Sequence, residues 1–73
     1  MPKLGKFSGK EVCKILEKNG FTQIRQAGSH IVLQKKFRDA TTTVIVPNHK
    51  EIKIGTLNSI IRQSGLAKQF FMR

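Results

Sequence analysis

The chain has 73 residues, enough for one small domain and too few for several independent cores. Lys and Arg total 14 against 4 for Asp and Glu, and the resulting formal charge of +10 favours a phosphate-rich partner such as nucleic acid. No apolar run is long enough to span a membrane, no secretory signal is predicted, and the single cysteine excludes an intrachain disulfide scaffold. We therefore expect one cytoplasmic domain over residues 1–73 that binds an anionic partner and not a membrane.

The first predicted element is a helix over residues 9–18. Ser8 and Glu11 have the spacing of a capping box, and Gly20 followed by Phe21 is typical of a helix that ends in a left-handed residue. The apolar stripe between these signals has helical spacing and consists of Val12, Ile15 and Leu16.

The middle of the chain predicts three strands, at residues 22–26, 30–37 and 41–46. The second and third are rich in β-branched residues, and Gly28 and residues 38–40 are the predicted turns. Connections this short make neighbouring strands antiparallel, so we expect a three-stranded meander.

A second helix is predicted over residues 56–64, with Thr56 as its N-cap and Gly65 at its end, followed by a last helical turn at 67–71. The element order is then α-β-β-β-α. An α+β domain follows, in which both helices pack on one face of the antiparallel sheet and leave the other face uncovered.

Alternation along the strands predicts which side chains occupy the uncovered face. If Ile31 and Leu33 point to the helices, His30 points away from them. The first strand is expected to bury Ile24 and so expose Arg25. If the turn around Gly28 contains an even number of residues and pairs Ile24 with Ile31, Arg25 lies opposite His30. The same alternation exposes Val32, Gln34, Lys36 and, on the third strand, Ile45.

Of the possible catalytic side chains, His30 is the most informative, because an imidazole beside a guanidinium can hold a phosphodiester and move a proton on it. On residue type alone, a histidine at a strand start is more often an ordinary surface residue. His49 is expected to be a solvated loop residue, and Cys13 a partly buried, inert thiol. The carboxylates Glu11, Glu17, Asp39 and Glu51 form no obvious pair, so no metal site is predicted.

Four motifs, in this order, give the chain a more specific resemblance. They are Ser8-Gly-Lys-Glu-Val12 with Leu16-Glu-Lys-Asn-Gly-Phe21, then Arg25-Gln-Ala-Gly-Ser-His30, Val46-Pro-Asn-His49 and Gly55-Thr-Leu-Asn-Ser-Ile60. Together they strongly resemble the HicA toxin family, from about residue 7 to residue 71.

The resemblance implies a fold like the double-stranded-RNA-binding domain and a toxin that cleaves mRNA and is neutralised by a HicB antitoxin. The catalytic histidine of the family corresponds to His30. We expect a metal-independent endoribonuclease without a cofactor, whose nucleophile is the 2′-OH of the RNA. The residues predicted to contact the RNA are Arg25, Ser29, Lys35, Lys36 and Lys50. Two alternatives remain: a non-catalytic RNA-binding module of the same fold, and a small protein-interaction domain whose charge only supports solubility.

Overall fold

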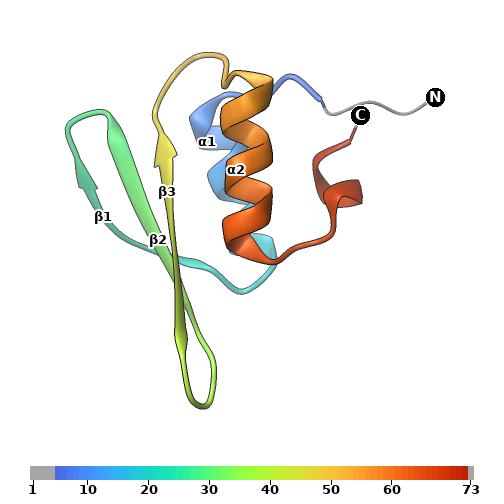
Figure 1. Ribbon diagram of the computed structural model, residues 1–73. Helices are drawn as coiled ribbons and strands as arrows, with labels where there is room; N and C mark the ends of the chain where they lie inside the picture. Colours follow the sequence, from blue (N-terminus) through green and yellow to red (C-terminus); the bar gives the residue numbers. More distant parts are fainter. Residues whose placement is uncertain (1–4, 73) are drawn as a thin grey trace.

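The computed structural model describes residues 5–72. The prediction that the N-terminus is not a secretory signal concerns residues that lie partly outside this range. The structure confirms the α-β-β-β-α order and the three-stranded antiparallel sheet, with strand order β1-β2-β3 (Figure 1). The elements are α1 (Gly9–Lys18), β1 (Thr22–Ala27), β2 (His30–Lys36), β3 (Thr41–Pro47), α2 (Ile54–Ser64) and the short 3-10 helix η1 (Lys68–Phe71). Within residues 5–72, no helix is both long enough and apolar enough to cross a membrane.

Helix α1 begins and ends as its sequence predicts. The backbone N–H of Glu11 donates to Ser8 Oγ at 3.1 Å, and the N–H of Ser8 donates to Glu11 Oε1 at 2.9 Å, which completes the capping box. Gly20 is left-handed, with φ 98°, and the N–H of Phe21 donates back to the Leu16 carbonyl at 3.0 Å. These bonds between neighbouring residues define both ends of the helix.

Helix α2 begins two residues earlier than predicted, so the assignment of Thr56 as its N-cap is wrong. The helix starts at Ile54 after Lys53, which has no side-chain capping bond. Just before it, Ile52 is buried and its N–H donates to the Phe7 carbonyl at 2.8 Å, so a tertiary contact sets the start of the helix. The predicted end is confirmed, because Gly65 is left-handed with φ 72°.

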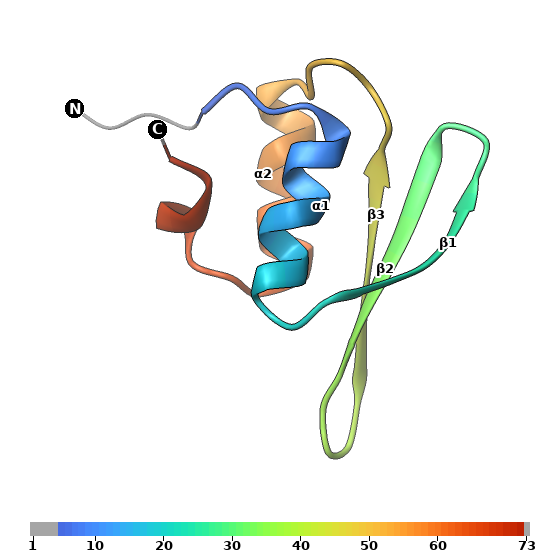
Figure 2. The same cartoon turned by 180° about the vertical axis from the view of Figure 1, so that it is seen from behind.

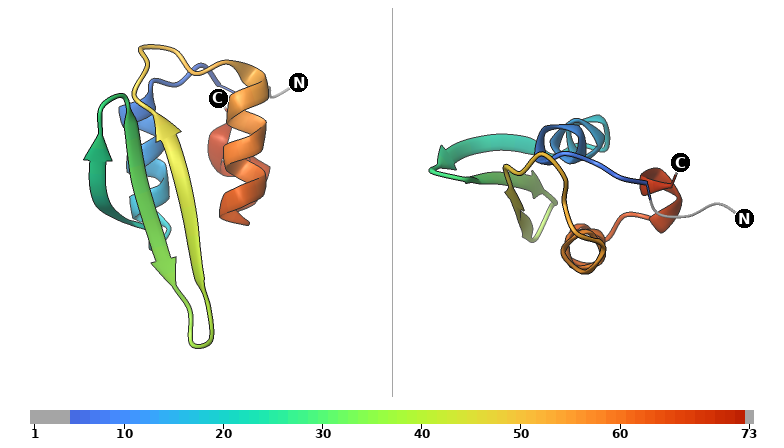
Figure 3. Two further views of the ribbon diagram at one scale, coloured as in Figure 1. Left: turned by 60° about the vertical axis from the view of Figure 1, so that its left-hand side comes forward. Right: turned by 90° about the horizontal axis from the view of Figure 1, so that it is seen from above.

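The core lies between the helices and one face of the sheet, as predicted (Figures 1 and 2). Strands β2 and β3 pair in unbroken register, and Ile31 and Leu33 of β2 are buried beside Val44 and Val46 of β3. Helix α2 packs mainly against β3, whereas α1 contacts β1, β3 and η1. The β2–β3 hairpin extends past the ends of the helices, and β1 curves away from them (Figure 3). All six residues of β1 are consequently exposed.

The start of α1 packs tightly against the chain that leaves β3. A Cβ atom on Gly9 would overlap the carbonyl oxygen of Pro47 and lie 2.9 Å from the Cα of Asn48. The N–H of Gly9 also donates to the carbonyl of His49 at 2.9 Å. Only glycine permits this approach, which ties the first turn of α1 to the end of the sheet.

Gly9→Ala tests this contact, with Gly55→Ala as its matched control, because both glycines lie in the first turn of a helix and nothing lies within 4 Å of a Cβ on Gly55. We expect Gly9→Ala to lower the free energy of unfolding by about 1–3 kcal/mol through overpacking. Gly55→Ala should raise it by up to about 1 kcal/mol, because alanine loses less entropy in a helix. Urea denaturation measures both, and equal effects would contradict the proposed steric constraint.

Candidate functional site

The face of the sheet turned away from the helices, here called the open face, carries a row of polar and apolar side chains across the strands. In one row across the sheet, His30 pairs with Ala27 on one side and Pro47 on the other. In the next row, Val32 pairs with Arg25 on one side and Ile45 on the other. Paired residues share a face of the sheet. The open face therefore combines one imidazole, one guanidinium and two aliphatic side chains at neighbouring positions.

His30 begins β2 directly after a two-residue turn, Gly28-Ser29. Gly28 has a φ of 59° and Ser29 does not have a positive φ, which is the pattern of a type II′ hairpin turn with glycine as its first central residue. His30 is exposed, as alternation from the buried Ile31 predicts. Its position at the end of the central strand makes the imidazole accessible to a large ligand.

Arg25 shares this face with His30, but the predicted direct pairing of the two residues is wrong. The two-residue turn pairs Ala27 with His30, so Arg25 lies opposite Val32. Arg25 is then diagonal to His30, at a Cβ separation of about 7–8 Å, which a long guanidinium side chain can still bridge. A group bound between them can contact both side chains.

The predicted burial of Ile24 is also wrong. The register slips between Gln23 and Arg25, so Ile24 is an extra residue in a β-bulge and is 49% exposed. A bulge interrupts the alternation of side chains, which the period-two pattern of the sequence does not reveal. Ile24 instead contributes to a hollow of about 390 Å³ whose lining residues are Gly20, Thr22, Ile24, Gln34 and Lys36.

The predicted RNA-contacting lysines fall into different surroundings. Lys36 is exposed at the far end of the open face. Lys35 is directed to the opposite face, where its Nζ lies 6.0 Å from the ring centre of Phe21 and 5.3 Å from that of Phe37. This cation–π packing occupies the Lys35 ammonium within the fold. Lys50 is exposed in the loop between β3 and α2.

The same loop lies beside the turn that precedes His30. The N–H of Asn48 donates to the carbonyl of Ser29 at 2.6 Å, while the carbonyl of His49 accepts the Gly9 N–H. His49, like His30, is exposed. The sequence separation of 19 residues hides this proximity, and only the register His30–Pro47 brings the two segments together.

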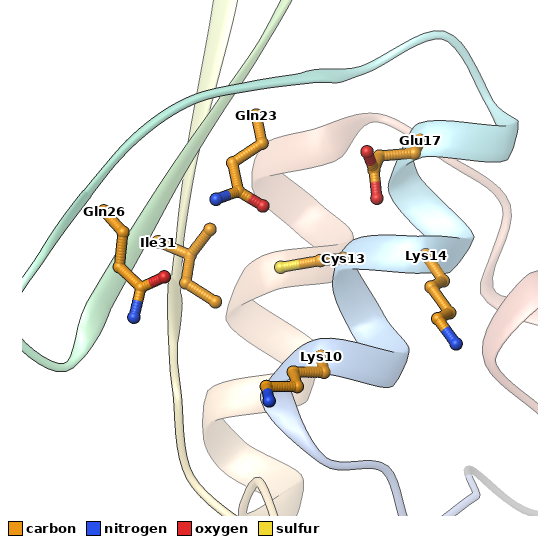
Figure 4. A pocket seen from close by; sticks show the side chains of 7 residues that line it. All are labelled: Lys10, Cys13, Lys14, Glu17, Gln23, Gln26 and Ile31. Carbon is orange, nitrogen blue, oxygen red and sulfur yellow. The ribbon is translucent and has the colours of Figure 1, made fainter.

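A second hollow, of about 250 Å³, lies between α1 and β1 (Figure 4). The thiol of Cys13 points into it, toward Gln23 and Ile31. Burial and, to a smaller extent, the negative charge of Glu17 raise the pKa of Cys13 from 9.0 to about 11. The thiol therefore stays protonated at neutral pH and is a poor nucleophile, in agreement with the prediction of an inert cysteine.

Within 5–72, no three His, Cys, Asp or Glu side chains are grouped so that they could hold a metal ion. In that range, no buried side-chain nitrogen or oxygen lacks a hydrogen-bond partner.

Most of the chain matches a known protein family. The model of a family described as the HicA toxin of bacterial toxin–antitoxin systems matches residues 9–66, which is most of the chain. It therefore covers α1, the whole sheet and α2, including the Gly28-Ser29-His30 turn. A search of curated proteins finds no match.

The raised pKa of Cys13 predicts slow alkylation of the folded protein. A shift from 9.0 to about 11 leaves roughly a hundredfold less thiolate at pH 8 than an ordinary thiol has, because each pKa unit is a factor of ten. Iodoacetamide labelling followed by mass spectrometry should thus be at least about a hundredfold slower in buffer than in denaturing urea. Equal labelling rates would show that the thiol is neither buried nor perturbed.

Proposed function

The chain belongs to the HicA toxin family, and from this premise we propose that it is a metal-independent endoribonuclease that cleaves mRNA, with His30 as a catalytic residue and a HicB-like protein as its antitoxin. The observation that carries the proposal is the exposed imidazole of His30 at the end of the open face, diagonal to Arg25. An imidazole can exchange a proton near neutral pH, and the guanidinium is a permanent positive charge. Both properties suit the cleavage of a phosphodiester.

The substrate itself can supply the nucleophile. His30 takes the proton of a ribose 2′-OH, the 2′-oxygen attacks the neighbouring phosphorus, and the bond from phosphorus to the 5′-oxygen breaks. The products are a 2′,3′-cyclic phosphate and a strand with a 5′-OH. Arg25 stabilises the charge that builds on the non-bridging phosphate oxygens. Because the 2′-OH attacks in place of water, the reaction does not require a metal-activated water.

Charge and exposure support RNA as the ligand of the open face. The chain carries a formal charge of +10, and Arg25, Lys36 and Lys50 are all exposed. Arg25 lies near one end of the face and Lys36 at the other, six residues along β2 from His30. At about 3.3 Å per residue this spans about 20 Å, which is long enough for several nucleotides of a single strand. Lys35 differs from these three residues, because its ammonium packs against two rings of the fold.

His30→Ala should preserve the fold and the affinity for RNA but lower cleavage by about 10²–10⁴, because an exposed imidazole adds little packing whereas proton transfer contributes this much. Gel analysis of RNA incubated with purified protein measures cleavage, and circular dichroism checks the fold. Lys18→Ala, an exposed change in the last turn of α1, is the control and should retain activity.

Three results of this assay would contradict the proposal. Cleavage by the His30→Ala protein at the wild-type rate would remove His30 from the mechanism, and loss of wild-type activity in EDTA would show that a metal is required. RNA that is bound but not cut by the wild type would favour a non-catalytic RNA-binding module instead.

The open face also has the composition of a surface for an acidic, partly apolar antitoxin. Ile45 is 51% exposed directly opposite the half-buried Val32, and both lie next to Arg25. Exposed apolar side chains edged by positive charge favour a protein partner of opposite charge over bulk water. An antitoxin seated there would cover His30 and so block access of the RNA.

Arg25→Glu should slow association with the antitoxin by several-fold, because it reverses a charge that steers encounter with an acidic surface. Lys18→Glu makes the same change of charge on α1, away from the open face, and should have little effect. Stopped-flow or surface-plasmon measurements with the HicB-like protein compare the two rates. Equal slowing by both variants, or a co-structure in which the antitoxin contacts only the helices, would contradict this mode of inhibition.

A further inference from the structure

The proposed cleavage by His30 leaves one proton unaccounted for. When the bond from phosphorus to the 5′-oxygen breaks, the electron pair stays on that oxygen, and an alkoxide is a poor leaving group unless it is protonated. A second group that delivers a proton on the side of the phosphate opposite to the attacking 2′-oxygen therefore accelerates this step. The inference drawn below rests on the proposed ribonuclease function.

The loop between β3 and α2 brings a second imidazole to the same end of the sheet as His30. Pro47 is the cross-strand partner of His30, and His49 follows two residues later. Cα atoms of directly opposite residues are about 4.5–5.5 Å apart in an antiparallel pair, and two residues of chain span at most about 7 Å. The Cα atoms of the two histidines consequently lie within about 13 Å of each other, a separation across which both imidazoles can reach one phosphodiester.

Backbone hydrogen bonds hold the loop in this position on both sides of His49. Asn48 donates to the carbonyl of Ser29 at 2.6 Å, directly before His30, and the carbonyl of His49 accepts the N–H of Gly9 at 2.9 Å. Because both bonds use only backbone atoms, the exposed imidazole of His49 is not required for them. The loop is thus ordered without the histidine side chain, which leaves that side chain available for a ligand.

The neighbouring ionisable groups are less suited to donate this proton. Glu51 is an exposed acidic side chain in the same loop, and its carboxylate would repel the phosphate. Lys50 is exposed in the same loop and is already proposed to contact the RNA as a positive charge. The Cys13 thiol opens into the hollow between α1 and β1, on the helix side of the sheet, away from the open face.

We propose that His49 is the general acid of the reaction and protonates the departing 5′-oxygen. His30 takes the proton from the 2′-OH, the bond from the 2′-oxygen to phosphorus forms as the bond to the 5′-oxygen breaks, and the His49 imidazolium transfers its proton to that oxygen. The reaction then ends with His30 protonated and His49 neutral, and exchange with water restores the starting forms. No oxidant, metal or further reactant is needed.

A sulfur substitution in the substrate distinguishes this role from a structural one. A short RNA that carries a linkage cut by the wild type is prepared in two forms, with the natural 5′-oxygen or with sulfur in its place. A thiolate leaves without protonation because a thiol is a far stronger acid than an alcohol. We expect His49→Gln to lower cleavage of the oxygen form by about 10²–10⁴ and to cleave the sulfur form within a few-fold of the wild type.

Matched variants separate the possible outcomes. His30→Ala should lose cleavage of both forms, because removal of the 2′-proton is needed in either case, and Glu51→Gln, an exposed change in the same loop, should lose neither. Equal losses of His49→Gln on both forms, or no loss on either, would overturn the assignment of His49 as the acid. A wild type that cleaves no RNA, so that no such linkage is found, would instead overturn the ribonuclease function itself.

Discussion

The alternation of side chains along β2 is the constraint on which the site depends. This central strand is paired on both sides, so Ile31 and Leu33 can be buried only if their neighbours point away from the helices. A slip of one residue would turn His30 into the core and expose two large aliphatic side chains. The hydrophobic free energy of the core therefore also fixes the face on which the imidazole lies.

The end of the sheet that carries His30 is held by backbone contacts rather than by its own side chains. Gly9 packs against Pro47 and Asn48 so closely that no Cβ fits, and the segments around Ser29 and His49 are joined to neighbouring chain by N–H to carbonyl bonds. Because these bonds join backbone atoms, they do not depend on the exposed side chains. Proton transfer at a bound phosphate requires a rigid backbone and imidazole side chains that are available to the ligand.

The same face serves both ligands in the proposed account, which explains its mixed composition. The proposed RNA cleavage uses Arg25 and His30, whereas the proposed protein complex also uses apolar area such as that of Ile45 opposite Val32. One acidic protein can then replace RNA by competing for the same positive charge while it covers the aliphatic side chains. Occupation by RNA and by antitoxin would be mutually exclusive, without any conformational change in the toxin.

The sequence by itself determined the elements whose ends depend on local bonds. The capping box of Ser8 and Glu11 and the left-handed Gly20 set α1 to the residue, and the apolar alternation of β2 and β3 set the faces of Ile31, Val44 and Ile45. The resemblance to the HicA family was likewise evident without coordinates, and the family match confirms it.

Only the tertiary structure decided what depends on contacts between distant segments. The bulge at Ile24 and the start of α2 at Ile54 follow from pairing with β2 and from the anchoring of Ile52 by Phe7, for which the local sequence has no signal. The approach of His49 to the His30 end of the sheet has the same origin, because strand register joins residues that are remote along the chain. Local bonds are encoded in neighbouring residues, whereas register and close approach are set by the packing of the whole chain.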